Sequence, residues 1–122
     1  IDELADVTTA YCENYPVLKN VKWDLVSDFN IQWYPKGGGF HALHCERSDA
    51  HPQCCNRMVA WMTYLNDIEE GGETYFKQQE CKVRPKKGLT LLWPADWTHF
   101  HKGIPAPNEE KMIITGWYDH VI

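Results

Sequence analysis

The stretch of sequence that decides the fold is "FNIQWY", residues 29–34. Its apolar residues Phe29, Ile31 and Trp33 alternate with residues 30, 32 and 34. A period of two residues is typical of a β-strand with one buried face, because successive side chains of a strand point to opposite sides. The stretch therefore predicts a half-buried strand.

The chain on either side of this strand contains further short apolar runs of the same kind. They are "FHALHCE" (40–46), "RMVAWMTYLN" (57–66), "ETYF" (73–76), "ECKVRP" (80–85), "LTLLW" (89–93) and "KMIITGWY" (111–118). Turn sequences rich in Gly and Pro, such as "PKGGG" and "EEGG", separate them. Short strands without helices between them predict an all-β core of antiparallel sheets, and we expect a jelly-roll double-stranded β-helix, cupin-like, with an open mouth between its sheets.

The N-terminal segment has a different period. Residues 2–15 place Leu4, Val7 and Tyr11 at helical spacing with acids in the first turn, and Pro16 blocks continuation. We expect one short helix here, ahead of a β core that covers residues 21–120 approximately.

Composition limits the other functions of the chain. A chain of 122 residues that is 43% hydrophobic predicts one domain over residues 1–122. The net charge of -5 works against nucleic-acid binding, which needs clustered Lys and Arg, and we expect the basic cluster at residues 82–87 to be a solvated hairpin. No apolar run approaches the roughly eighteen residues that cross a bilayer, so we expect a soluble chain without a membrane partner. Because it begins with Ile1, the chain is interpreted as an excised domain or a mature chain.

The five cysteines are an odd number without Cys-x-x-Cys spacing. They indicate neither a zinc knuckle nor a disulfide framework, and they favour the cytoplasm or another reducing compartment. The adjacent Cys54 and Cys55 are interpreted as free thiols, with a disulfide or a metal as the alternative.

The segment "HALHCE" places His44 and Glu46 two residues apart, so on a strand their side chains share a face while Cys45 points away. A second source of imidazole is "WTHFHKGIP", which carries His99 and His101. Two histidines and one carboxylate on one face of an octahedral ion form the non-haem Fe(II) site used for oxygen activation, because three positions stay open. Taken alone, a His-x-Glu pair is more often an ordinary polar patch.

Lys111 lies ten residues after His101 and begins an alternating strand, on which Ile113, Thr115 and Trp117 share its face. A lysine that faces an apolar interior is costly unless it meets an anion there. Alone, Lys111 would be interpreted as a surface residue. Together with the histidines it predicts an anchor for a cosubstrate that carries a carboxylate.

From "WYPKGGGFHALHCE" through "NRMVAWMTYLNDIEEGGETYF" to "HKGIPAPNEEKMIITGW", the sequence resembles the prolyl 4-hydroxylase-like 2-oxoglutarate and Fe(II)-dependent dioxygenases. The resemblance covers residues 29–118 approximately. It implies Fe(II) as cofactor, 2-oxoglutarate and O2 as cosubstrates, and hydroxylation of an unactivated C–H bond with succinate and CO2 as co-products. The implied substrate is a prolyl residue in a peptide or protein, with a small molecule as the alternative. The oligomeric state is left open.

Carried over residue by residue, the resemblance implies that His44, Glu46 and His101 bind the iron. Lys111 would pair with the far carboxylate of 2-oxoglutarate. His99 is an alternative distal ligand, but the spacing of ten residues to Lys111 favours His101.

The resemblance also suggests residues that line the pocket. Tyr34, Tyr64 and Thr115 are expected beside the cosubstrate, with Trp117 as a further wall. The tryptophans considered for an aromatic wall against the substrate are Trp61, Trp93 and Trp97, which are otherwise core residues.

Glu46 departs from the family pattern, which has aspartate there. Glutamate adds one methylene, about 1.5 Å of reach, so either the metal lies farther from this segment or the side chain folds back. Asp49 is discounted as the carboxylate because it lies five residues from His44. The alternative function is a metal-binding or peptide-binding β-sandwich without turnover; a zinc hydrolase is disfavoured because no separate general base is apparent.

Overall fold

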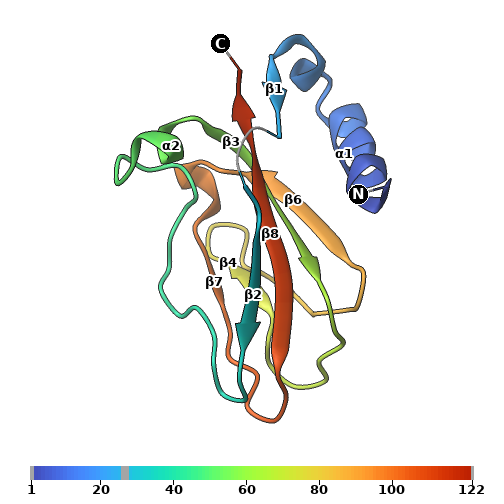
Figure 1. The fold of residues 1–122 in the computed structure, drawn as a ribbon, viewed down its shortest axis with the longest axis vertical. Coiled ribbons are helices and arrows are strands. Elements are labelled where there is room, and N and C mark those ends of the chain that lie inside the picture. The colour runs from blue at the N-terminus through green and yellow to red at the C-terminus, as the bar shows by residue number, and fades with distance from the viewer. Residues whose placement is uncertain (1, 26–27, 122) are drawn as a thin grey trace.

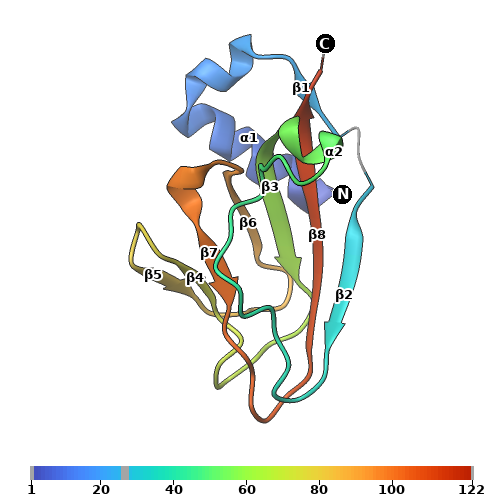
Figure 2. The same cartoon turned by 90° about the vertical axis from the view of Figure 1, so that its left-hand side faces the viewer.

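The computed structural model describes residues 2–25 and 28–121, and consists of two antiparallel sheets that face each other (Figures 1 and 2). The large sheet has the order β1–β8–β3–β6, with β2 also paired to β8. Its strands are β1 (Trp23–Asp24), β2 (Asn30–Tyr34), β3 (Arg57–Tyr64), β6 (Thr90–Pro94) and β8 (Lys111–His120). The small sheet, in the order β5–β4–β7, consists of β4 (Thr74–Phe76), β5 (Cys81–Val83) and β7 (His101–Gly103). The predicted all-β core is confirmed.

The N-terminal helix α1 (Asp2–Asn14) is also confirmed, and it packs against the large sheet near β6 (Figure 1). The Thr8 hydroxyl lies 2.9 Å from the Tyr118 hydroxyl on β8. A 3₁₀ turn at Pro16–Asn20 follows the helix, as expected from the proline. The remaining helical elements are α2 (Pro52–Cys55) and a 3₁₀ turn at Trp97–His99. Within the described residues, no helix is both long and apolar enough to cross a membrane.

Strand β3 is the centre of the core because it is buried on both faces. Ala60, Met62 and Tyr64 point between the two sheets and form one apolar cluster with residues of β4, β6 and β8. Val59 and Trp61 point to the other side, where they pack with Tyr118 under α1. Alternation thus sends neighbouring residues of one strand into two separate cores.

The strand predicted from "FNIQWY" is present as β2, but its apolar face points outward. Phe29, Ile31 and Trp33 are 60%, 68% and 57% exposed, whereas Gln32 and Tyr34 point toward the space between the sheets. The reason is that β2 pairs with β8 in a register that places Tyr34 beside Lys111. The inner face of this strand therefore lines the cavity between the sheets, where Tyr34 also packs against the apolar cluster of β3.

The predicted strand at residues 40–46 is wrong. This segment is an irregular loop that meets β7 at a single bridge, in which the backbones of His44 and His101 exchange hydrogen bonds of 3.0 and 2.8 Å. Gly103 also donates a hydrogen bond to the carbonyl of Phe40. Likewise, His99 lies in a 3₁₀ turn, and only His101 begins a strand. The loop between β2 and α2 thus lies beside the small sheet at the mouth of the molecule.

Candidate metal and cosubstrate site

A cavity of about 150 Å³ lies between the two sheets and is bordered by residues from both. Its ionisable groups are divided between two places. His44, Glu46 and His101 form a cluster, and Lys111 lies apart from them on β8. The cavity thus combines a cluster of metal-ligand type with a separate buried cation.

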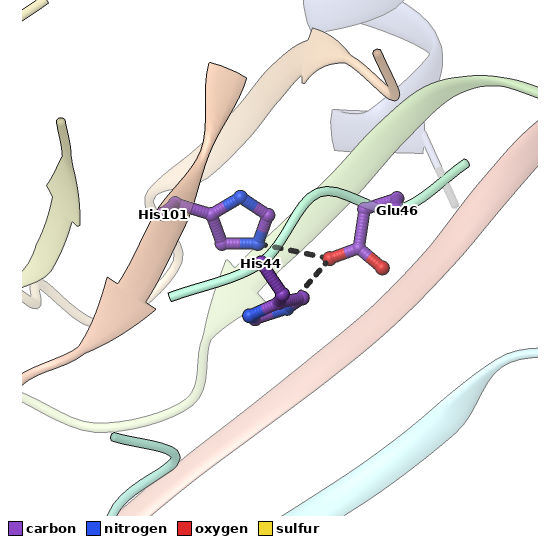
Figure 3. Close-up of side chains that lie close together, drawn as sticks. All are labelled: His44, Glu46 and His101. Atoms are coloured by element: carbon purple, nitrogen blue, oxygen red, sulfur yellow. Dashed lines mark hydrogen bonds and ion pairs between the residues drawn. The ribbon is translucent and has the colours of Figure 1, made fainter. Parts of the chain in front are cut away.

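The cluster joins the loop at residues 40–46 to the start of β7 (Figure 3). Nε2 of His101 lies 2.9 Å from Oε1 of Glu46, and Nε2 of His44 lies 3.3 Å from the same oxygen. One ligand atom from each residue falls within 4.8 Å of the others. For metal–ligand bonds of about 2.1 Å, neighbouring ligands of an octahedral ion lie about 3 Å apart. The two separations from Oε1 of Glu46 fit such an ion.

The hydrogen bonds of the two imidazoles also fit a cation. Nδ1 of His44 lies 2.8 Å from the carbonyl of Ala42, and Nδ1 of His101 lies 3.0 Å from the carbonyl of His99. A carbonyl only accepts, so Nδ1 of each ring donates to it, and Nε2 of each ring faces Glu46 as an acceptor when the ring is neutral and as a donor when it is protonated. Three acceptors that converge in this way repel one another unless protons or a metal ion lie between them. A divalent metal satisfies all three at once.

The electrostatics of Glu46 agree with this. Burial alone would raise the pKa of Glu46, but hydrogen bonds from His101 and His44 and the charge of the two rings lower it well below the ordinary value. For His44, burial lowers the pKa, and the hydrogen bonds to Glu46 and Ala42 with the charge of Glu46 outweigh it, so that the pKa is raised. Glu46 is therefore a carboxylate, ready to bind a cation.

The alternative ligands lie elsewhere. The ring of His99 packs against Phe76 and lines a separate groove, while its carbonyl holds His101. Asp49 is exposed and does not belong to the cluster. Of the candidates considered from the sequence, the structure brings together His44, Glu46 and His101.

Lys111 is 3% exposed, and its ammonium group lies inside the cavity near Gly103 and 5.9 Å from the centre of the Tyr34 ring. Burial lowers the pKa of Lys111 to about 8, although the charge of Glu73 acts in the opposite direction. No acidic side chain of residues 2–25 and 28–121 forms an ion pair with it. A buried ammonium group without a counter-ion is suited to bind an anion that enters the cavity.

The other residues expected beside the cosubstrate are only partly brought together. Tyr34 and Thr115 line the cavity with Lys111. Tyr64 does not: it is fully buried below the cavity, where its hydroxyl lies 2.6 Å from Thr74 and donates a hydrogen bond to the carbonyl of Val83. Thr74 lines the cavity in its place. Thr74 was not expected from the sequence, because its position at the cavity depends on how the two sheets face each other.

The tryptophans expected near the cavity also differ in whether they line it. Trp117 lines the cavity, and its indole N–H donates a hydrogen bond to Oε2 of Glu46. Trp61 only borders the cavity, because its ring packs on Gly116 in the outer core, where a β-carbon on the glycine would lie 2.5 Å from the ring. Trp97 is 73% exposed on its 3₁₀ turn and lies outside the lining. Of the two, Trp61 therefore lies in the cavity lining and Trp97 does not, and an aromatic wall against the substrate stays a prediction.

Two further side chains contact the cluster: Trp93, which was expected in an aromatic wall, and Arg57, which was not expected from the sequence. Trp93 of β6 packs edge-on against the His101 ring, with 5.0 Å between the ring centres. Arg57 of β3 donates a hydrogen bond to the main-chain carbonyl of Glu46. The alternation of "RMVAWMTY" gives no signal for Arg57, since it predicts that Arg57 points away from the cavity.

Two facing β-sheets with two histidines and a carboxylate at the edge of the cavity between them define a class of mononuclear metal proteins. The sequence profile of the 2OG-Fe(II) oxygenase superfamily matches residues 29–119, and the chain belongs to this superfamily. Its members use Fe(II), 2-oxoglutarate and O2. The predicted family and cofactors are confirmed.

The relatives and solved structures that the chain resembles include prolyl hydroxylases. Probable prolyl 4-hydroxylase 9 of Arabidopsis thaliana is 30% identical over 113 residues, which are 73% of this chain and 39% of that protein. The viral collagen prolyl hydroxylase of Paramecium Bursaria Chlorella virus-1 matches 99% of this chain and 72% of its own, with a TM-score of 0.69 and 24% identity. A Pseudomonas putida prolyl-4-hydroxylase matches 79% of this chain and 54% of its own, with a TM-score of 0.64 and 26% identity. The double-stranded β-helix is confirmed, and the chain spans less than half of the Arabidopsis relative.

Proposed function

We propose that residues 1–122 form the catalytic domain of a 2-oxoglutarate and Fe(II)-dependent dioxygenase that hydroxylates a prolyl residue in a peptide or protein. The observation that carries the proposal is the division of the cavity: a metal-ligand cluster lies on one side, and on the other lies the buried Lys111, which forms no ion pair with any residue that the structure describes. This is the arrangement that a cosubstrate with a carboxylate at each end requires.

In the proposed reaction, 2-oxoglutarate, O2 and the substrate C–H bond give succinate, CO2 and an alcohol. Fe(II), when bound, supplies the activation of O2 and the oxidation of the C–H bond. His44, Glu46 and His101 would hold the ion with one ligand atom each, which would leave coordination positions for the reactants. The protein supplies orientation and a cavity from which water is excluded.

Lys111 has the role of binding the far carboxylate of 2-oxoglutarate. An ammonium–carboxylate hydrogen bond inside a low-dielectric cavity is stronger than one in water. Tyr34 lies beside Lys111 in the strand pairing, and Thr115 lines the same cavity farther along β8, so the lining offers two further hydroxyls. The Tyr34 hydroxyl donates a hydrogen bond to Gln32, which holds it in place.

A prolyl substrate is supported by the relatives, several of which are named as prolyl hydroxylases. At the mouth of the cavity, Phe40 is half-exposed and packs edge-on against His44, so an apolar ring lies beside the cluster.

A reducing compartment such as the cytoplasm is supported by the five cysteines, all of which are free thiols in the structure.

The test is to supply Fe(II), 2-oxoglutarate and O2 to the protein and to measure succinate, with and without a panel of proline-containing peptides. We expect succinate formation that increases with the right peptide and that is absent in His101→Ala. Succinate no higher than in His101→Ala with every peptide would contradict catalysis and favour a binding module without turnover. In such a module, Lys111→Ala would leave 2-oxoglutarate affinity unchanged.

A further inference from the structure

The two oxygens of Glu46 have different neighbours. Oε1 faces Nε2 of both histidines, at 2.9 and 3.3 Å. Oε2 accepts a hydrogen bond from the indole N–H of Trp117, at 3.2 Å. The side toward the histidines is the one on which a metal would lie, so Oε2 is turned away from that position by its hydrogen bond.

Arg57 contacts both Glu46 and Trp117. Its Nη1 donates to the main-chain carbonyl of Glu46 at 3.1 Å and lies 3.7 Å from Oε2. Its guanidinium carbon lies 3.7 Å from the centre of the Trp117 ring, at stacking distance. One side chain thus contacts the backbone of the ligand, the carboxylate of the ligand and the ring that holds the carboxylate.

A β-bulge aims Arg57 at this position. The register between β3 and β8 pairs Arg57 with Asp119 and Val59 with Tyr118, so Met58 is an extra residue on β3. Without it, Arg57 would share the face of Val59 and Trp61, which is the face under α1. The bulge turns Arg57 to the opposite face, where Glu46 and Trp117 lie.

We infer that Trp117 is a positioning residue that makes Glu46 a one-oxygen ligand, and that Arg57 holds Trp117 and the Glu46 backbone in place. The inference rests on the proposed metal site. Glutamate has one more rotatable bond than aspartate, and its free carboxylate can rotate to present both oxygens to a metal. A hydrogen bond to Oε2 removes this freedom and keeps a position open on the metal for the reactants.

The first experiment measures metal affinity rather than turnover. Titration calorimetry with Mn(II) in the absence of 2-oxoglutarate compares the wild type with Trp117→Phe, which keeps a ring but loses the N–H. We expect Trp117→Phe to weaken Mn(II) binding by about 10-fold or more, because the carboxylate is no longer held in place before the metal binds and loses rotational freedom on binding, a cost that we expect to exceed the gain from a second oxygen. Trp97→Phe is the matched control, because Trp97 is exposed and far from the cluster lining; it should bind as the wild type does.

The second experiment tests whether Trp117 acts through the length of Glu46. In Glu46→Asp the carboxylate is withdrawn by about 1.5 Å. An aspartate that binds the metal is therefore expected to lose the hydrogen bond from the Trp117 indole N–H. We therefore expect Trp117→Phe to cost much less Mn(II) affinity in the Glu46→Asp background than in the wild type. A merely structural role of Trp117 predicts the same loss in both backgrounds, and that result would overturn the inference.

The third measurement is spectroscopic. With Co(II) bound, a second oxygen from Glu46 raises the coordination number and changes the ligand-field absorption. We expect this change in Trp117→Phe, and a smaller one in Arg57→Gln, which removes the stacking charge but leaves the indole N–H. Identical Co(II) spectra in the wild type and both variants would also contradict the inference.

These outcomes separate the inference from the proposed function. If the wild-type protein binds neither Mn(II) nor Co(II), the metal site itself is refuted. If the wild type binds both metals and Trp117→Phe binds them equally well, the metal site stands and the positioning role of Trp117 is refuted.

Discussion

At one side of the cavity the carboxylate of Glu46 lies between two imidazoles, whereas at the other the ammonium group of Lys111 has no ion-pair partner among the described residues. Both groups are charged and largely buried, yet only the cluster is held by hydrogen bonds from the protein. The difference indicates that the protein builds the metal position in advance. The lysine, by contrast, is left to be completed by the cosubstrate.

The largest expected effect is at the cluster. Glu46→Gln keeps the length of the side chain but removes its charge, so two imidazoles are left without an anionic partner. We expect Mn(II) affinity measured by calorimetry to fall by more than about 100-fold, beyond the loss typical of an outer hydrogen bond. Glu73→Gln is the control at the lysine side and should leave Mn(II) affinity unchanged. Equal affinities of Glu46→Gln and the wild type would remove Glu46 from the site.

Lys111→Met should give opposite effects on binding and stability. Loss of a charge-assisted hydrogen bond is expected to weaken 2-oxoglutarate binding by about 10- to 100-fold. Because burial lowers the pKa of Lys111 to about 8, the folded state holds the charged form at a cost, and the free energy of unfolding at pH 7 should rise by about 1–3 kcal/mol.

Urea unfolding and calorimetry measure the two quantities in Lys111→Met, with the exposed Lys82→Met as the control. A variant that binds 2-oxoglutarate as well as the wild type would show that the anion does not meet this lysine. A destabilised variant would show that Lys111 is satisfied within the folded protein.

The lysine side should also respond to pH. Below a pH of about 8, Lys111 is protonated and 2-oxoglutarate affinity should be constant with respect to this group. Above it, the empty protein loses the proton that the bound carboxylate requires, so affinity should fall by up to about tenfold for each further pH unit. In Lys111→Arg the guanidinium stays charged and the affinity that remains should not fall in this range. A wild-type affinity that is flat from pH 7 to about pH 10, near the reference lysine value, contradicts the low pKa of Lys111.

The smallest effect is expected at Glu73, whose charge acts to raise the pKa of Lys111. Glu73→Gln should move the pH at which 2-oxoglutarate affinity begins to fall to a lower value, without changing the affinity plateau at lower pH by much. Binding curves at several pH values measure the shift. A shift to higher pH would mean that Glu73 does not act on Lys111 through its charge.

The ligand residues could be predicted from the sequence, although one of the reasons was wrong. His44 and Glu46 were expected to share the face of a strand, but they lie in a loop with a single bridge to β7. They converge because the His44 backbone is paired with His101, so the loop is fixed at the point where the ligands are needed. Spacing identified the residues, and long-range pairing gave them their geometry.

The positions that could not be predicted depend on contacts between distant strands. Alternation in "FNIQWY" indicated a strand, but only its pairing with β8 decides that Gln32 and Tyr34 face the cavity. The bulge at Met58, which turns Arg57 toward Glu46, has no local sequence signal. A one-residue change in register reverses every side chain beyond it, and register is set by the neighbouring strand.

The sequence by itself determined the all-β core, the N-terminal helix, the family and the three residues of the cluster, because period, turn residues and motif spacing are local properties of the chain. Only the tertiary structure decided that Lys111 has no ion-pair partner among the described residues, that Tyr64 lies below the cavity, and that Trp117 and Arg57 contact Glu46. These depend on which faces of separate strands meet. In particular, the carboxylate of Glu46 accepts a hydrogen bond from a tryptophan 71 residues away along the chain.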